Sequence, residues 1–299
     1  MNEKYAATKL KYSSRAINKV VIGSETSDGA GVRLRRYIAS PELDMLDPFL
    51  LMDVFRSDNP DDYIAGFPAH PHRGFETVTY LLRGNMRHRD SVGHEGVIKA
   101  GGVQWMTAGR GIVHSEMPEQ EEGLLHGFQL WVNLPARDKM MPPRYQEFSP
   151  EDIPVEQREQ GVNVRVVSGT TITGVNGAVK AVAASPLYLD VTLDAEKYFM
   201  EQIASGHQAF IYVIEGEMNI LSTKGSDSLR AESLGVFSGD GDLVELSSKT
   251  GGRFLLVAGR PFNEPVARYG PFVMNTQAQI AEAIEDYRSA QLGHIANEK

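Results

Sequence analysis

The stretch from Phe67 to Leu82 reads FPAHPHRGFETVTYLL, and from Glu76 onward it follows the two-residue period of a β-strand. The run stops at Arg83-Gly84-Asn85, which predicts a hairpin turn. A second run, LLHGFQLWVNL from Leu124 to Leu134, places alternate residues on one face: His126, Phe128, Leu130 and Val132. Short strands recur about every ten residues between Gly- and Asp-containing turns, which is typical of an all-β sandwich or barrel.

The composition of the 299-residue chain narrows its class further. The length suits two domains of about 150 residues each. The chain has no cysteine, which excludes disulfide scaffolds, zinc ribbons, iron–sulfur clusters and cysteine nucleophiles. Any metal must therefore be bound by His, Asp or Glu, and eight histidines are available.

Charge and hydropathy indicate where the protein acts. The net charge of −9 disfavours direct binding to nucleic acid. No apolar run approaches the ~20 residues of a membrane span, so no membrane partner is expected. These features predict a cytoplasmic protein, with a nuclear location as the alternative in a eukaryote.

An internal repeat predicts how the domains are organised. Tyr80-Leu-Leu-Arg-Gly-Asn-Met86 matches Tyr212-Val-Ile-Glu-Gly-Glu-Met218, and Gly109-Arg-Gly111 matches Gly239-Asp-Gly241 at nearly the same offset. A duplicated β domain follows, with an N-terminal domain at 1–138, a C-terminal domain at 139–299 and a proline-rich linker within 135–154. One helix is expected near the end, with Thr276 as its N-cap, Ile280 and Ile284 on one face, and Gly293 as its stop.

Two segments of the first half carry residues that suit a metal. His70, His72 and Glu76 are spaced to share one face of a strand, and His114 and Glu116 share a face after a glycine-bracketed turn. Imidazoles and a carboxylate suit Fe(II), Mn(II), Ni(II), Cu(II) or Zn(II). Glu76 has an alternative role as an ion-pair partner of Arg73 or Arg83, and His114 as an ordinary core histidine. The spacing alone does not choose between Glu76 and Glu116 as the carboxylate ligand.

The repeat provides an internal control for this site. Its offsets place Val244 and Leu246 at the positions of His114 and Glu116, and Gln202 and Ala204 at those of His70 and His72. The second half therefore lacks the ligand set, and the chemistry is expected in the N-terminal metal-binding domain.

The two segments resemble a known family. The pattern H-x-H-x3-E, followed by a glycine-bounded segment ending in His, resembles the two cupin motifs. The run from Phe67 to Pro118 is similar to the pirin family, as are Leu46–Met52 and Gly270–Thr276. The resemblance implies a bicupin, with two tandem cupin domains of jelly-roll β-sandwich or barrel form and a C-terminal helix.

The resemblance also implies a site and its metal. General cupins take the carboxylate ligand from the first motif, whereas pirins take it from the second, which selects Glu116. The implied metal ligands are His70, His72, His114 and Glu116. The implied metal is Fe(II), with Mn, Ni, Cu and Zn as alternatives. The second motif lacks the proline and asparagine of general cupins, but no pirin ligand position is altered.

Three activities are compatible with the resemblance. The first is a quercetin (flavonol) 2,3-dioxygenase, in which the metal binds the substrate hydroxyl, O2 is the co-substrate and Glu116 is the general base. Candidate substrate contacts are Phe67, Phe75, Trp105 and Met106. The alternative is an iron-dependent, redox-sensing regulatory protein or transcription cofactor that acts through a protein partner. A cupin isomerase is a third reading, for which the sequence offers no sugar or phosphate signal.

Overall fold

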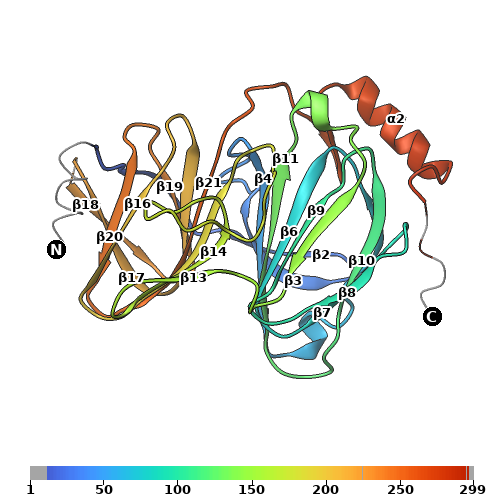
Figure 1. The fold of residues 1–299 in the computed structure, drawn as a ribbon. Helices are drawn as coiled ribbons and strands as arrows, with labels where there is room; N and C mark the ends of the chain where they lie inside the picture. Colours follow the sequence, from blue (N-terminus) through green and yellow to red (C-terminus); the bar gives the residue numbers. More distant parts are fainter. Residues whose placement is uncertain (1–11, 224, 294, 296–299) are drawn as a thin grey trace. The chain divides into compact units, whose positions relative to one another are not determined.

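The computed structural model describes residues 12–223, 225–293 and 295, and nearly all of its regular structure is β (Figure 1). The described part of the chain contains one α-helix, α2 (Gln277–Arg288), and two 3-10 turns, Pro60–Asp62 and Ala136–Asp138. The expected all-β class with a C-terminal helix is confirmed.

The chain forms two compact units, and each takes residues from both ends of the sequence. The first unit is the described part of Ser24–Asp152 and Phe262–Lys299, and the second is that of Met1–Gly23 and Ile153–Pro261. The expected division is a single cut between 138 and 139. The observed arrangement differs because the last segment of the chain packs on Val113 of the first unit, whereas Ile17–Val21 pairs with Ser233–Phe237 of the second.

Two antiparallel sheets build the first unit. The larger sheet has the order β12 (Arg144–Phe148), β9 (Val103–Thr107), β6 (Phe75–Arg83), β11 (Leu125–Asn133), β4 (Phe49–Ser57), β3 (Val32–Ile38), β2 (Ser24–Asp28). The smaller sheet has the order β5 (Phe67–His72), β10 (Ile112–Pro118), β7 (Met86–Asp90), β8 (Glu95–Ile98). Apolar side chains from both sheets, including Phe55 and Leu81 from one and Met86 and Ile98 from the other, form a shared core.

A short hairpin and the helix complete the first unit. The hairpin pairs β22 (Ala267–Tyr269) with β23 (Phe272–Met274), and α2 follows it. Thr276 caps α2 as expected, because its hydroxyl accepts from the Gln279 N–H while the Gln279 side chain accepts from the Thr276 N–H. The helix ends at Arg288, with Ser289 as its C-cap, and Gly293 lies beyond this end. Phe272 and Met274 then join Ile280 and Ala283 in one apolar cluster.

The second unit is a ten-stranded sheet system around an apolar core. Its main path is β1 (Ile17–Val21), β19 (Ser233–Phe237), β17 (Gln208–Ser222), β21 (Gly252–Gly259), β15 (Leu187–Leu193), β14 (Val162–Ser168), β13 (Val155–Glu159). The remaining strands are β16 (Lys197–Gln202), β18 (Gly225–Arg230) and β20 (Leu243–Ser248). Val244 and Leu246 are fully buried in the core, where the repeat places the equivalents of His114 and Glu116.

Two local expectations are wrong. Arg83-Gly84-Asn85 is not a hairpin, because β6 and β7 belong to different sheets and the chain crosses from one to the other. The matching segment around Gly216 lies inside β17, which also changes partners along its length. The segment 135–154 is not only a linker, since β12 within it pairs with β9.

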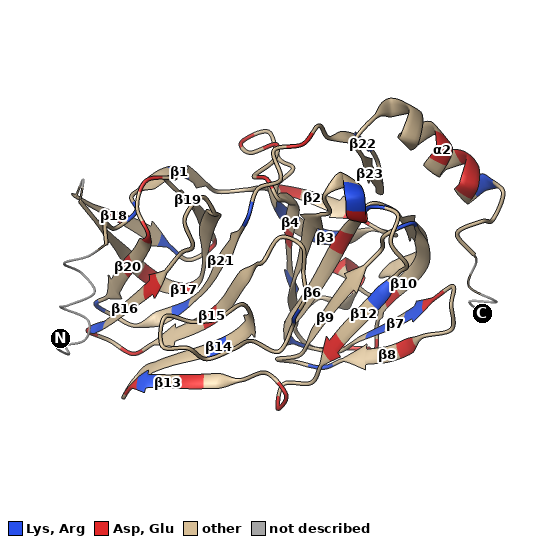
Figure 2. Cartoon of the chain, turned by 45° about the horizontal axis from the view of Figure 1, so that its top comes forward, with Lys and Arg blue, Asp and Glu red and all other residues tan. Residues whose placement is uncertain are grey.

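Charged residues of both signs are distributed over both units. Figure 2 shows basic and acidic positions interspersed along the strands, with several acidic positions on α2. In the part of the chain that the structure describes, no helix is long and apolar enough to cross a membrane.

Candidate metal centre

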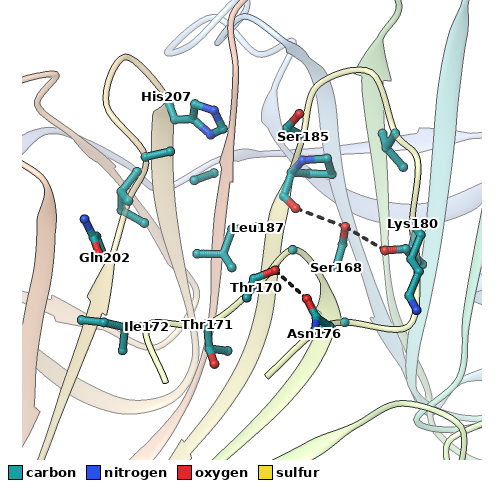
Figure 3. Close-up of a pocket in the computed structure, with 18 of the residues that line it drawn as sticks. Ser168, Thr170, Thr171, Ile172, Asn176, Lys180, Ser185, Leu187, Gln202 and His207 are labelled. Atoms are coloured by element: carbon teal, nitrogen blue, oxygen red, sulfur yellow. Dashed lines mark hydrogen bonds between the residues drawn. The ribbon is translucent and has the colours of Figure 1, made fainter. Parts of the chain in front are cut away.

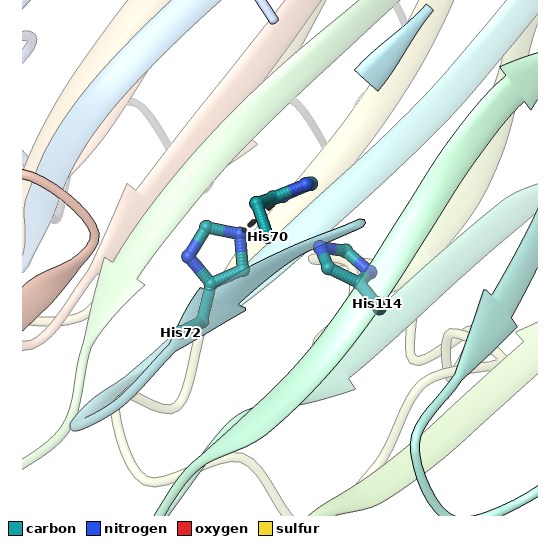
Figure 4. A group of neighbouring side chains, drawn as sticks. All are labelled: His70, His72 and His114. Carbon is teal, nitrogen blue, oxygen red and sulfur yellow. Dashed lines mark hydrogen bonds between the residues drawn. The ribbon is translucent and has the colours of Figure 1, made fainter. Parts of the chain in front are cut away.

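Three histidines converge where β5 and β10 pair (Figure 4). His70 lies directly opposite His114 in the antiparallel register, and His72 lies opposite Ile112. One ring nitrogen from each histidine can be chosen so that all lie within 4.8 Å of one another. The pairing explains the cluster, because residues opposite each other on neighbouring strands point to the same face.

The spacing of the rings fits a shared metal ion. The Nε2 atoms of His70 and His72 are 3.0 Å apart. Two imidazole nitrogens bound at about 2.1 Å and at right angles to one another would lie about 3.0 Å apart. The Nδ1–H of His70 donates to the Pro68 carbonyl at 2.8 Å, which leaves the Nε2 lone pair of His70 facing the cluster.

Burial favours the neutral form of His72 and His114, which is the form that metal ligation requires. Burial, and secondly the charge of His70, hold the pKa of His72 well below 6.5. The pKa of His114 is lowered in the same way, by burial and then by its neighbouring histidines. Both nitrogens of His114 and Nδ1 of His72 are buried without a hydrogen-bond partner. Such orphaned nitrogens are costly in a protein interior, and a metal ion at the triad would relieve that cost.

Glu116 follows His114 by two residues on β10 but is not part of the close histidine group, and both of its carboxylate oxygens accept hydrogen bonds. Thr79 donates to Oε1 at 2.7 Å and Gln129 donates to Oε2 at 2.9 Å. Glu116 is 1% exposed and lines the same cavity as His70 and His72. Its carboxylate is thus available at the wall of the histidine cavity in a fixed orientation.

Glu76 faces away from the triad. The chain turns at Arg73-Gly74 between β5 and β6, and the ring of Phe75 then packs on His72 at 5.0 Å between ring centroids. Because side chains alternate along a strand, Glu76 points to the opposite face of β6, where Thr107 donates to its Oε1 at 2.6 Å. The two-residue period of a single strand therefore does not put His72 and Glu76 on one face, because this turn interrupts the strand.

We expect Glu76→Gln to remove a pH dependence of stability. Burial raises the pKa of Glu76 from 4.5 to about 7, against the opposing hydrogen bond from Thr107. The folded protein therefore binds more protons than the unfolded chain between these pH values, so stability falls as pH rises through that window. The variant should be more stable than the parent at pH 8, by up to about 3 kcal/mol, and nearly equal to it at pH 4.5.

Urea denaturation of the chelator-treated protein at several pH values measures this difference. Parallel stability profiles for parent and variant would contradict the assignment of a buried, titrating Glu76. Metal content of the same variant is the companion measurement, and it should be unchanged.

Two histidines of the triad, His70 and His72, line a cavity of about 540 Å³ within the first unit. Of the candidate substrate contacts, Phe67 lines this cavity, and Phe75 contacts His72 and Trp131. Met106 lies in a separate cluster with Ala108 and Ile112, and Trp105 lies opposite Val78 in the larger sheet. The structure thus brings Phe67 and Phe75 to the histidines and does not bring Trp105 or Met106 to the cavity lining.

Several residues that line this cavity were not predicted from the sequence. Trp131 lies on β11 and faces the cavity, with its ring 5.2 Å from that of His72 and the guanidinium of Arg268 4.9 Å from its own centroid. Arg36 makes a two-bond contact with Asp53, and both also line the cavity. The alternation that put His126 and Phe128 on one face of β11 implied an opposite face with Gln129 and Trp131, which was the available signal.

The two β units and the histidine triad define the class, a bicupin whose first unit carries a cluster suited to a metal ion. The family model for pirin matches residues 31–132, and that for the pirin C-terminal cupin domain matches residues 188–293. The chain belongs to the pirin family, as its sequence motifs predicted.

Individual relatives extend this match over most of the chain. A pirin-like protein of Caulobacter vibrioides is 53% identical over 274 residues, which is 92% of this chain and 98% of the relative. Pirin of Homo sapiens is 45% identical over 284 residues, covering 94% and 95%. The crystal structure of a quercetin 2,3-dioxygenase from Acinetobacter baumannii has a TM-score of 0.86 at 33% identity, covering 95% of this chain and 100% of that chain.

Proposed function

We propose that the first unit is a mononuclear iron(II) site that catalyses the 2,3-dioxygenation of quercetin or a related flavonol. The observation that carries the proposal is a close triad of imidazoles, of which His72 and His114 are buried, with His70 and His72 lining a cavity of about 540 Å³, a size suited to a small molecule. The fold similarity to a protein named quercetin 2,3-dioxygenase supports the choice of substrate class.

His70, His72, His114 and Glu116 are the residues proposed to hold the metal. Imidazole and carboxylate donors suit Fe(II), and they suit Mn(II), Ni(II), Cu(II) and Zn(II) as well. When bound, the metal supplies Lewis acidity, which lowers the pKa of a flavonol hydroxyl.

Glu116 is proposed to accept the proton that the substrate hydroxyl releases. Its carboxylate lies on the cavity wall, and the hydrogen bonds from Thr79 and Gln129 fix its orientation. A base held in this way needs no rearrangement at the moment of proton transfer.

Apolar side chains of the cavity are proposed to orient a flat aromatic substrate and exclude water. Phe67 comes from β5 and Trp131 from the facing β11, and both line the cavity. Aromatic rings at such positions favour stacked or edge-on contacts with another ring.

Oxygen consumption tests this activity. The iron-loaded protein is mixed with quercetin without oxygen, and oxygen is then admitted while its uptake and the release of carbon monoxide are followed. We expect both signals in the loaded protein and neither in the metal-free protein. An absence of uptake at full iron occupancy would exclude quercetin as a substrate. The same assay on Mn, Ni, Cu and Zn forms ranks the metals.

A further inference from the structure

A cavity of the second unit has a volume of about 950 Å³ and shares no lining residue with the cavity beside the histidine triad. Its walls are the irregular segment between β14 and β15 and the turn between β16 and β17. In Figure 3, Gln202 and His207 lie on one side, and Asn176 and Lys180 lie on the other. All of its lining residues belong to the second unit.

The polar side chains of this cavity favour an anion over a cation. Lys180, His207, Gln202 and Ser185 line it, and each of these side chains carries a hydrogen-bond donor. Among the described residues that line the cavity, none is acidic and none carries a phenyl, phenol or indole ring. The lining thus lacks the carboxylates a cationic ligand would need and the aromatic platforms on which flat rings stack.

Two arginines add positive charge around His207. Arg15 donates to the His207 carbonyl at 2.7 Å, and Arg260 donates to the Ala183 carbonyl at 2.9 Å on the facing segment. The pKa of His207 is lowered first by burial and then by the charges of Arg260 and Arg15. Positive potential therefore reaches the imidazole at the cavity wall.

A nearby acid, Glu201, does not cancel this charge at the cavity. Its side chain is fully buried and forms an ion pair with Arg158. The backbone N–H groups of Ile172 and Gln202 also donate to the Glu201 carboxylate, at 2.7 and 3.0 Å. Its negative charge is offset by these partners, and the bond to Ile172 fastens the wall segment to β16.

The floor of the cavity is apolar. Leu187, Ile203 and Ala258 line it and belong to the apolar core of the second unit. A ligand seated there would meet donors at its ends and hydrocarbon beneath it. An inorganic anion would use only the first of these features and would leave most of the volume empty.

The wall segment is held in an unusual backbone conformation. Ala181 and Ser185 both line the cavity and have φ values of 54° and 46°, which non-glycine residues rarely adopt. The Ser168 hydroxyl donates to the Pro186 carbonyl at 3.1 Å and fixes the end of the segment. Strained residues of this kind concentrate at binding and catalytic sites.

We propose that this cavity binds a small organic acid, with its carboxylates held by Lys180, His207 and the neighbouring donors and its carbon skeleton lying on the apolar floor. The site is separate from the histidine triad and does not depend on the proposed oxygenase activity.

Three matched probes test the proposal by isothermal titration calorimetry on the full chain. Adipate carries two carboxylates on a four-methylene chain, 1,6-hexanediol carries a similar chain without charge, and inorganic phosphate carries charge without a chain. We expect adipate to bind at least about tenfold more tightly than either of the others, and more weakly as salt is raised. Equal binding of phosphate would mean an adventitious ion only, and equal binding of hexanediol an apolar pocket. Either result, or no adipate binding, would overturn the proposal.

Variants locate the binding site. Lys180→Gln and His207→Gln should each weaken adipate binding by about fivefold or more, while metal content stays at the parent level. Lys249→Gln is the control, because it removes the same charge from an exposed turn of the same unit that does not line the cavity. Unchanged affinity in both cavity variants would contradict the assignment, whatever the first unit does with quercetin.

Discussion

Replacing His114 with alanine should remove stoichiometric metal binding. His114 is 1% exposed, both of its ring nitrogens are buried without a hydrogen-bond partner, and its ring lies 4.5 Å from that of His70 and 4.9 Å from that of His72. Loss of one donor from so small a set should weaken metal affinity by about 100-fold or more. Metal content after dialysis, followed by competition with a chelator of known affinity, measures the change.

His94→Ala is the matched control for this experiment. His94 is an exposed histidine of the same unit, and its Nδ1 lies 3.0 Å from Asp90. His94 is not part of the close histidine group, so the metal content of His94→Ala should equal that of the parent protein. Full occupancy in His114→Ala would show that the triad is not the metal site, and the proposed oxygenase would lose its basis.

Replacing Gly74 with alanine should be among the most damaging single changes in the first unit. Gly74 follows His72 and Arg73 at the turn into β6 and has a φ of 88°. A Cβ atom there would lie 2.0 Å from the Val273 carbonyl oxygen, which is backbone and cannot rotate away. The Gly74 carbonyl also accepts from the buried Lys139 ammonium at 2.7 Å, so a shift of the turn disturbs a second contact. The expected loss of stability is on the order of 4 kcal/mol.

Gly93→Ala separates the effect of contact from that of conformation. Gly93 has a similar φ of 93°, but a Cβ atom there would meet nothing within 4 Å. Its replacement should cost about 1 kcal/mol, from backbone strain alone. Urea denaturation of both variants measures the difference. Equal losses would show that the turn yields easily and that the Val273 contact is unimportant.

The fold was largely predictable because strand alternation and turn residues are local signals. The runs 76–82 and 124–134 became β6 and β11, and Thr276 caps α2. The crossing between sheets at Gly84 was not predictable, because a glycine turn looks the same whether the next strand pairs with the previous one or leaves its sheet. The sequence also did not predict that the segment from Phe262 onward belongs to the first unit, since this depends on contacts between residues far apart in sequence.

The histidine cluster followed from spacing, but its surroundings did not. The two-residue period predicted that His72 and Glu76 share one face of a strand. It fails because a turn at Gly74 separates two strands of different sheets. The sequence Arg87-His88-Arg89 favours a solvated turn, yet His88 lies on β7 at 3% exposure with its Nε2 2.6 Å from a Glu147 carboxylate oxygen. Both errors concern side chains whose environment is supplied by another strand.

The return of the C-terminal segment to the first unit has a consequence for biosynthesis. The three histidines are translated before the Ile153–Pro261 part of the second unit, but Arg268, Gly270 and Pro271 of the cavity wall are translated after it. The backbone hydrogen bonds between Arg73 and residues 271–273 can form only after that segment has been synthesised. A nascent chain that folds in order of synthesis therefore carries its histidine cluster with one wall missing until the second unit has been made. Closure of the cavity is thus a late step in the folding of the chain.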